Sequence, residues 1–301
     1  MPKIIPHLWF DNQAVEAAEF YTGIFPDSHV TGTSRLFDTP SGDCDLVYFE
    51  LAGHPFQAIS AGPEFVFNPS ISFMLNFDPS RDNRARERLD ESWNELSRGG
   101  KALMPLDAYP FSKRYGWVQD RFGLSWQLIL SNPEGEPRPF IVPSLMFTKA
   151  MAGKAEEAID FYASVFKNAK RGATARYPAG SEPDKEGTLM YADVMLENQW
   201  FAAMDSAQRH DFSFNEAVSL IVSCDDQEEI DYYWSRLSAV PGAEQCGWLK
   251  DRYGVSWQIS PAVVADMLAN GTREQIDRVT RAFLKMKKFD VATLEREYLK
   301  G

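Results

Sequence analysis

An internal repeat constrains this fold more than any other feature of the sequence. Three pairs of segments recur in the same order, namely 14–25 with 155–166, 67–75 with 214–222 and 116–128 with 247–259. The closest pair is GWVQDRFGLSWQL against GWLKDRYGVSWQI. Matching segments in one order indicate two copies of one structural unit. Ten residues of the first copy, within 98–115, have no counterpart in the second.

The repeat predicts how the chain divides. The predicted parts are a first domain at 1–131, a linker at 132–141, a second domain at 142–260 and a helical appendix at 261–301. The seam SNPEGEPRPF contains three prolines and one glycine, which favour an extended connection. In the appendix, Gly271 is typical of a helix end, Thr272 with Gln275 of a capping box, and Asp290 of a second helix start.

Each copy has the pattern of a mixed α+β fold. A short β-prone run at 4–10 precedes an apolar helical stripe at 14–25, and strand-like runs follow. The order strand, helix, strands occurs twice in each copy, which predicts two βαβββ modules per domain. In the DRFG and DRYG segments, Asp120 and Asp251 are expected to accept bonds from nearby backbone N–H groups, while glycine adopts the positive φ of a tight turn. Trp126 and Trp257, which alternate with Gln127 and Gln258, are expected in the core.

Composition excludes several functional classes. The chain has 31 Lys and Arg against 43 Asp and Glu, a net charge of -12, with no basic cluster. It is therefore not expected to bind nucleic acid or an anionic membrane. No run approaches the roughly 18 apolar residues of a membrane span, and no signal-peptide pattern occurs, so a cytoplasmic protein is expected. Three cysteines without CxxC spacing suggest neither a disulfide framework nor a cysteine zinc site.

The segments WFDNQAVEAAEFYTGIFPDS, FVFNPSISFML and GWVQDRFGLSWQL resemble the PhnB-like branch of the glyoxalase, bleomycin-resistance and extradiol-dioxygenase superfamily, also called vicinal-oxygen-chelate proteins. The resemblance covers residues 4–131 and 141–260 in a tandem two-copy form. It implies that each domain curls a mixed sheet around a cleft, with helices outside. Members of this branch often carry the name 3-demethylubiquinone-9 3-methyltransferase. However, the sequence has no glycine-rich strand-to-helix loop of the kind that cradles a nucleotide-like methyl donor.

The resemblance also implies which positions line the clefts. Metal-dependent members of the superfamily place ligands on four strands. The matching residues are His7, Gln57, Ser70 and Gln127 in the first copy, and Ser144, Ala202, Ala217 and Gln258 in the second. The first set has one imidazole, two amides and a hydroxyl, but no negative charge to offset the desolvation of a divalent ion. We therefore expect no metal and no other cofactor.

These residues predict a metal-independent, small-molecule-binding protein with one competent cleft in the first domain and a degenerate second domain. The predicted ligand-binding residues are His7, Gln57, Ser70 and Gln127, joined by Tyr115 and Phe111 from the additional first-copy segment. That segment is interpreted either as a lid over the cleft or as a plain hairpin extension. His7 has a structural alternative as well, as a partly buried histidine of the core.

Three other functions stay open at this stage. The first is a metal-dependent lyase, isomerase or dioxygenase that uses His7, Gln57 and Gln127. The second is the methyltransferase named for the branch, which requires affinity for S-adenosylmethionine. The third is an interaction protein whose cleft is filled by its own side chains. The expected partner is an unidentified small molecule, and pairing with a second copy of the chain as a homodimer stays open.

Overall fold

The computed structural model describes residues 2–132 and 134–300, which divide into two compact units. The first unit comprises Met1–Gly23, Asp27–Val66 and Asn215–Gly301, and the second comprises Ile24–Pro26 and Phe67–Phe214. These units do not coincide with the predicted domains at 1–131 and 142–260. Each unit combines residues of both sequence copies.

The chain contains four modules of the predicted strand, helix, strands type. The first module is β1 (Ile4–Phe10), α1 (Ala14–Ile24), β2 (His29–Thr39), β3 (Gly42–Leu51) and β4 (His54–Ser60). The second is β5 (Ile71–Phe77), α2 (Ala85–Ser97), β6 (Lys101–Tyr109), β7 (Ser112–Gln119) and β8 (Ser125–Leu130), and the third is β9 (Ile141–Phe147), α3 (Ala155–Val165), β10 (Lys170–Arg176), β11 (Leu189–Leu196) and β12 (Gln199–Asp205). The fourth is β13 (Val218–Cys224), α4 (Gln227–Leu237), β14 (Trp248–Lys250) and β15 (Ser256–Pro261). Within the described residues the fourth module has no strand matching β6, which accounts for the ten residues missing from the second copy.

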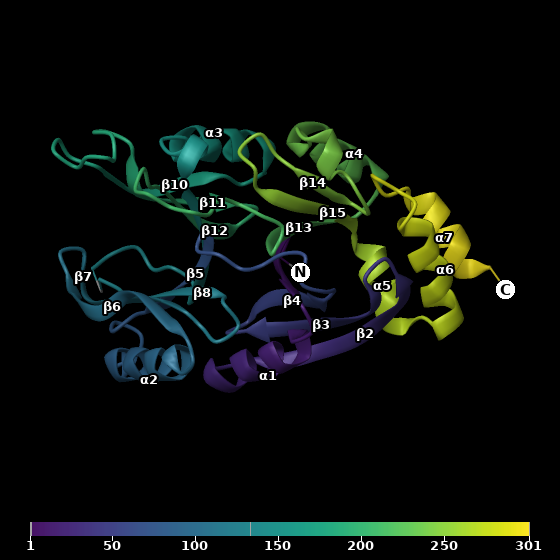
Figure 1. Cartoon of the computed structure of the whole chain (residues 1–301), viewed down its shortest axis with the longest axis horizontal. Coiled ribbons are helices and arrows are strands. Elements are labelled where there is room, and N and C mark those ends of the chain that lie inside the picture. Colours follow the sequence, from purple (N-terminus) through teal and green to yellow (C-terminus); the bar gives the residue numbers. More distant parts are fainter. Residues whose placement is uncertain (1, 133, 301) are drawn as a thin grey trace. The chain divides into compact units, whose positions relative to one another are not determined.

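The modules pair across the two copies. The first unit has a seven-stranded sheet in the order β14-β15-β13-β1-β4-β3-β2, so it joins the first and fourth modules (Figure 1). The second unit has an eight-stranded sheet in the order β10-β11-β12-β9-β5-β8-β7-β6, which joins the third and second modules. The junctions are the antiparallel pairs β1–β13 and β5–β9. Each junction hides a strand edge that a lone module would expose.

Helices pack against one face of each sheet. In the second unit, the ring of Trp93 on α2 lies so close to Gly116 of β7 that a Cβ there would come within 2.4 Å of it. Trp126 on the same sheet face is completely buried, and Trp257 of the first unit is 1% exposed. The prediction that both tryptophans are core residues is confirmed. Gln127 and Gln258 alternate with them and therefore point to the opposite face.

The repeated DRFG and DRYG segments are structural turns, as predicted. The Asp120 carboxylate accepts hydrogen bonds from the backbone N–H of Phe122 at 2.8 Å, from that of Leu124 at 3.1 Å, and from Trp126 Nε1 at 2.8 Å. Gly123 has a φ of +87°. Asp251 makes the equivalent three bonds with Tyr253, Val255 and Trp257 at the same distances. Each turn ties its carboxylate to the core tryptophan of the next strand.

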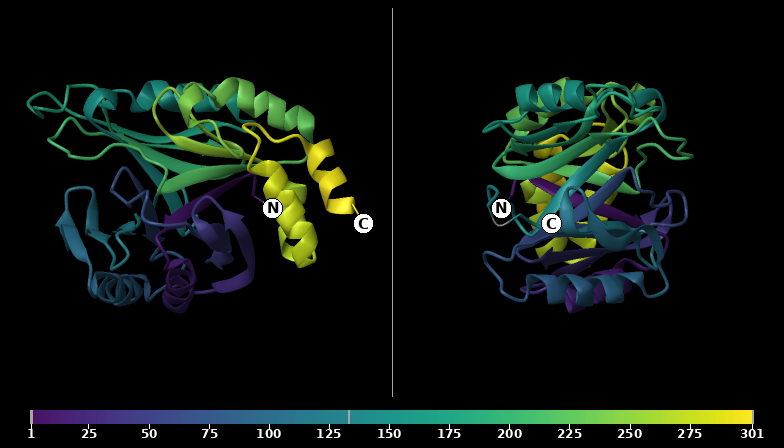
Figure 2. Two further views of the ribbon diagram at one scale, coloured as in Figure 1. Left: turned by 45° about the vertical axis from the view of Figure 1, so that its right-hand side comes forward. Right: turned by 90° about the vertical axis from the view of Figure 1, so that its left-hand side faces the viewer.

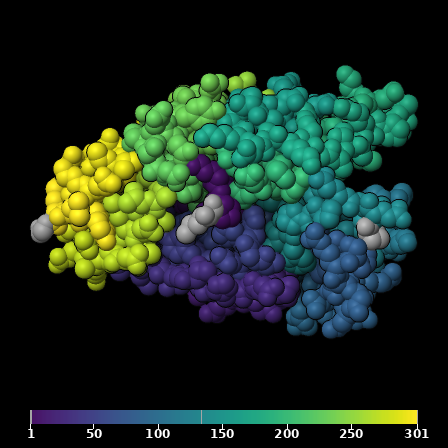
Figure 3. All heavy atoms as spheres, turned by 180° about the vertical axis from the view of Figure 1, so that it is seen from behind, coloured from purple at the N-terminus to yellow at the C-terminus, as the bar shows by residue number. Residues whose placement is uncertain are grey.

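The C-terminal appendix consists of α5 (Ala262–Asn270), α6 (Arg273–Phe283) and α7 (Val291–Leu299), all within the first unit. Figure 2 shows these helices in yellow-green and yellow, and Figure 3 shows one face of the surface that their atoms form. The predicted capping box of Thr272 and Gln275 is present, Asp290 caps α7, and Gly271 ends α5. Both α5 and α6 contact β2, and Ser34 Oγ donates to the Leu268 carbonyl at 2.9 Å. Among the described residues, no helix is long and apolar enough to cross a membrane.

Candidate functional site

The sheet of the first unit carries a row of polar side chains on the face opposite Trp257. Tyr48, Gln57, His7 and Ser219 stand side by side in register across β3, β4, β1 and β13. Gln258 of β15 lies beside this row, because its amide Nε2 donates to Ser219 Oγ at 2.9 Å. We call these five residues the His7 face. They come from both sequence copies.

His7 is held as a neutral imidazole with one free N–H. Its side chain is 2% exposed, and burial lowers its pKa to about 3. The Ser219 hydroxyl accepts from Gln258, and its oxygen lies 3.4 Å from His7 Nδ1, which is the acceptor that the described residues offer for its proton. With Ser219 as the donor, the neutral ring carries its own proton on Nε2. No residue that the structure describes is a hydrogen-bond partner of this Nε2.

Two amides of the His7 face also have unused hydrogen-bonding atoms. The Gln57 side chain is partly exposed and makes no hydrogen bond with any described residue. Gln258 donates through Nε2, while its Oε1 has no partner in the same part of the chain. The face therefore presents an N–H donor, a carbonyl acceptor and a complete amide.

A chain of aromatic rings begins at His7. Trp248 lies edge-on to the imidazole, with ring centroids 5.5 Å apart, and Trp9 lies 6.2 Å from Trp248 at 78°. Phe65 contacts Trp9 at 5.1 Å. The Trp9 indole N–H donates to the Gly62 carbonyl at 2.8 Å, so Trp9 contributes its apolar ring to the site.

The second unit has a matching face whose polar atoms are bonded to one another. Strand register places Ser144, Ala202, Ser72 and Gln127 where the first unit has His7, Gln57, Ser219 and Gln258. Gln127 Oε1 accepts from the Tyr115 hydroxyl at 2.7 Å, and its Nε2 donates to Ser72 Oγ at 2.8 Å and lies 3.5 Å from Ser144 Oγ. Burial raises the pKa of Tyr115, which keeps this donor protonated. We call this set the Gln127 face.

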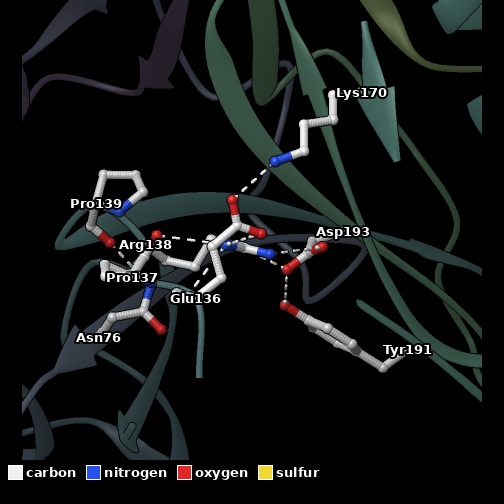
Figure 4. A network of polar contacts seen from close by, with 8 residues as sticks. All are labelled: Asn76, Glu136, Pro137, Arg138, Pro139, Lys170, Tyr191 and Asp193. Carbon is white, nitrogen blue, oxygen red and sulfur yellow. Dashed lines mark hydrogen bonds and ion pairs between the residues drawn. The ribbon is translucent and has the colours of Figure 1, made fainter. Parts of the chain in front are cut away.

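An arginine from the predicted linker pairs with Asp193 (Figure 4), the strand neighbour of Ala202 on the Gln127 face. Arg138 Nε donates to Asp193 Oδ2 at 2.8 Å, Nη2 donates to Oδ1 at 3.3 Å, and the guanidinium lies 3.7 Å from the centroid of the Trp200 ring. Asp193 is 3% exposed and also accepts from the Tyr191 hydroxyl at 3.4 Å. A Cβ at Gly172 would lie 1.8 Å from Asp193 Oδ1, so this position has room only for glycine.

The structure divides the predicted ligand-binding residues between the two sheets. His7 and Gln57 share the first sheet, whereas Gln127 and Tyr115 share the second and are hydrogen-bonded to each other. Ser70, just before β5, contributes backbone bonds: its carbonyl accepts from Met146 N–H, and its N–H donates to Asn68. Phe111 lies between β6 and β7 and is 58% exposed. The additional first-copy segment lies in the hairpin of β6 and β7.

Sequence reasoning missed Ser72 and Ser219 as neighbours of the two strand glutamines. Both serines lie two residues beyond the predicted positions, Ser70 and Ala217, on the same side of their strands. Strand alternation carries this signal, because it allows a shift of two residues without a change of face. No sequence pattern pointed to Arg138 and Asp193, because they lie on distant segments of the chain that share no motif.

The His7 face does not fit a divalent metal ion. Its possible ligands are one imidazole, two amides and two hydroxyls, and none carries a negative charge at neutral pH, because burial raises the Tyr48 pKa to about 12. Divalent ions in proteins are usually held by several imidazoles, thiolates or carboxylates. In the part of the chain that the structure describes, no three His, Cys, Asp or Glu residues form a group able to hold a metal.

Comparisons with known proteins place the chain among relatives. A family model described as 3-demethylubiquinone-9 3-methyltransferase matches residues 2–129 and again 139–260. A PhnB protein from Bacillus cereus, assigned provisionally to that activity, is 34% identical over 43% of this chain and 99% of its own length, with a TM-score of 0.38. No curated protein matches the chain.

Two solved structures that align with most of the chain resemble it in fold. Glyoxalase I from Zea mays is 12% identical and covers 89% of this chain and 98% of its own, with a TM-score of 0.52. A provisionally assigned dioxygenase from Bacillus subtilis is 12% identical and covers 99% of this chain and 97% of its own, with a TM-score of 0.50. At this level of identity the similarity shows the fold alone.

Proposed function

The chain belongs to the family described as 3-demethylubiquinone-9 3-methyltransferase, and from this premise we propose that it binds a small molecule on the His7 face without a metal ion. The predicted kinship with the PhnB-like branch and the predicted α+β fold of tandem glyoxalase-like modules are confirmed. The binding face itself is our inference from the residues of the first unit.

The observation that supports this proposal is the unequal use of polar atoms on the two faces. On the Gln127 face, the amide of Gln127 is bonded to Tyr115 and Ser72, and Asp193 is bonded to Arg138. On the His7 face, three groups have unused capacity, namely His7 Nε2, the Gln57 amide and Gln258 Oε1. Polar atoms that have no partner within the protein take one from water or from a ligand, so one or the other is expected opposite the His7 N–H.

Ligand-observed NMR with a set of small aromatic and carbonyl fragments tests the proposal, with the protein treated beforehand with a chelator. We expect fragments that bind the wild type to lose their signal with His7→Ala and to keep it with Ser144→Ala, which alters the matched position of the second unit. Equal losses with the two variants would overturn the choice of face. Circular dichroism and the unfolding midpoint establish that both variants fold.

Metal retention tests the second part of the proposal. The protein is incubated with manganese, iron, nickel and zinc, freed of unbound ions, and analysed for metal. We expect much less than one ion per chain. One ion per chain that disappears with His7→Ala would overturn metal independence and would support a lyase, isomerase or dioxygenase.

The family description also names a methyltransferase, and a direct titration addresses that activity. Calorimetry with S-adenosylmethionine is expected to show no binding, since no glycine-rich strand-to-helix loop is present in the sequence. Saturable binding of this compound would replace our proposal with the activity in the family name.

A further inference from the structure

We propose that the ligand of the His7 face is an uncharged, flat ring compound whose edge carries a carbonyl oxygen next to an N–H or O–H donor, as a lactam does. This inference rests on the proposed function, because it assumes that the His7 face is where the ligand binds. It goes further in naming the chemical class from the atoms that this face leaves unpaired.

The carbonyl is assigned from His7. Ser219 is fully buried, and His7 Nδ1 is the acceptor that the described residues offer for its hydroxyl proton, so the tautomer that satisfies Ser219 carries the ring's own proton on Nε2. An N–H donor that has no partner within the protein selects a hydrogen-bond acceptor. A carbonyl oxygen is an acceptor that an uncharged planar compound can present in the plane of its ring.

The neighbouring donor is assigned from Gln258. Its Nε2 is committed to Ser219, which leaves Oε1 as an acceptor with no partner among the residues described. The imidazole and this amide both bond to the Ser219 hydroxyl. One ligand edge that satisfies both must therefore present an acceptor and a donor. Gln57, opposite His7 on β4, can bond to either group.

The absence of charge on the His7 face indicates an uncharged ligand. Tyr48, Gln57, His7, Ser219 and Gln258 are all neutral at physiological pH. Lys250 of β14, at the edge of the sheet, is paired with Glu216 at 2.7 Å. A carboxylate or ammonium group placed against His7 would lose its hydration without meeting an opposite charge, which is strongly unfavourable.

The flat shape is assigned from the aromatic side chains. Trp9 makes edge-to-face contacts with Phe65 and with Trp248, each at an interplanar angle of 78°. Trp9 and Trp248 are each partly exposed, so they retain surface for a further ring. Aromatic rings favour stacked or edge-on contact with other rings. A bicyclic aromatic ring matches this lining better than a flexible chain does.

Calorimetric titration with three probes of similar size tests the proposal. The probes are 2-quinolinone, which has the carbonyl and the N–H; N-methyl-2-quinolinone, which lacks the donor; and quinoline-2-carboxylate, which is an anion. We expect 2-quinolinone to bind, and the N-methyl compound to bind about tenfold more weakly, as one unmade hydrogen bond predicts. The carboxylate should bind at least about a hundredfold more weakly, since an unpaired charge is costlier to desolvate. Gln258→Leu should bring the two neutral probes to equal affinity, and Ser144→Ala should leave their difference unchanged.

The outcomes separate the ligand class from the choice of face. If the carboxylate or the N-methyl compound binds as tightly as 2-quinolinone, and His7→Ala still abolishes binding, the class is wrong and the face is right. If 2-quinolinone does not bind up to its solubility limit, the class is wrong as well. If 2-quinolinone binds equally to the wild type, His7→Ala and Gln258→Leu, the face itself is wrong and the proposed function fails with it.

Discussion

The two inner faces of this protein are built from matching strands, yet they differ in what their polar side chains do. Gln127 and Gln258 occupy equivalent positions, and each donates to a serine. The Tyr115 hydroxyl also donates to Gln127 Oε1, whereas the repeat places Cys246 at the position matching Tyr115. Gln258 Oε1 therefore has no equivalent donor. The presence of polar residues on a face therefore does not define a site. What matters is whether neighbouring strands already use their hydrogen bonds.

The largest expected effect concerns the arginine that completes the second face. Arg138→Ala leaves Asp193, 3% exposed, without its cation, and should lower the free energy of unfolding by about 4 kcal/mol. Urea unfolding followed by fluorescence measures this loss. The double variant Arg138→Met with Asp193→Leu should recover most of it, because no buried charge remains. A loss below about 1 kcal/mol would mean that the pair behaves as an exposed ion pair and does not close this face.

The pH dependence of stability should distinguish His7 from its counterpart Ser144. The folded pKa of His7, about 3, is below the unfolded value of 6.5, so the unfolded chain binds the extra proton as the pH falls. Stability is therefore complete above pH 6.5 and decreases toward pH 3, by about 3 kcal/mol between pH 7 and pH 4.

Unfolding of the wild type and of His7→Ser, which copies position 144, measures this contribution as the difference between their pH profiles. His54, whose pKa is lowered to about 4 by burial, contributes with the same sign in both proteins and cancels from the difference. Parallel pH profiles would show that His7 is hydrated, and that the N–H on which the ligand assignment rests is bonded to water.

The two repeated turns should respond alike. Asp120→Ala and Asp251→Ala each remove three hydrogen bonds of the same geometry, so each should cost about 2 to 3 kcal/mol of stability. Thermal unfolding of the two variants checks the match. A large effect of one variant alone would indicate that one turn has a role beyond structure and that the units differ more than their backbones suggest.

The smallest expected effect is that of the hydroxyl that closes the Gln127 face. Tyr115→Phe leaves Gln127 Oε1 without its donor and should cost about 1 kcal/mol. The control is Tyr109→Phe, whose hydroxyl bonds a carbonyl at an exposed position and should change stability by less than about 0.5 kcal/mol. Equal costs for the two variants would mean that Tyr115 does not keep the second face closed.

The sequence alone determined the modules of this protein and their order. Local physical chemistry predicts the features that depend on residues close together in the chain. These features are the repeated segments, the DRFG and DRYG turns and the capping signals at Thr272 and Asp290. His7 and Gln57 could be placed on one face because they share the first module. Only the tertiary structure decided which modules pair. A strand edge can be covered by any compatible strand, and local pattern carries no preference between β5 and β13 as the neighbour of the first module. That choice brings Ser219 and Gln258 to His7, and it places His7 and Gln127, which belong to one sequence copy, on different sheets.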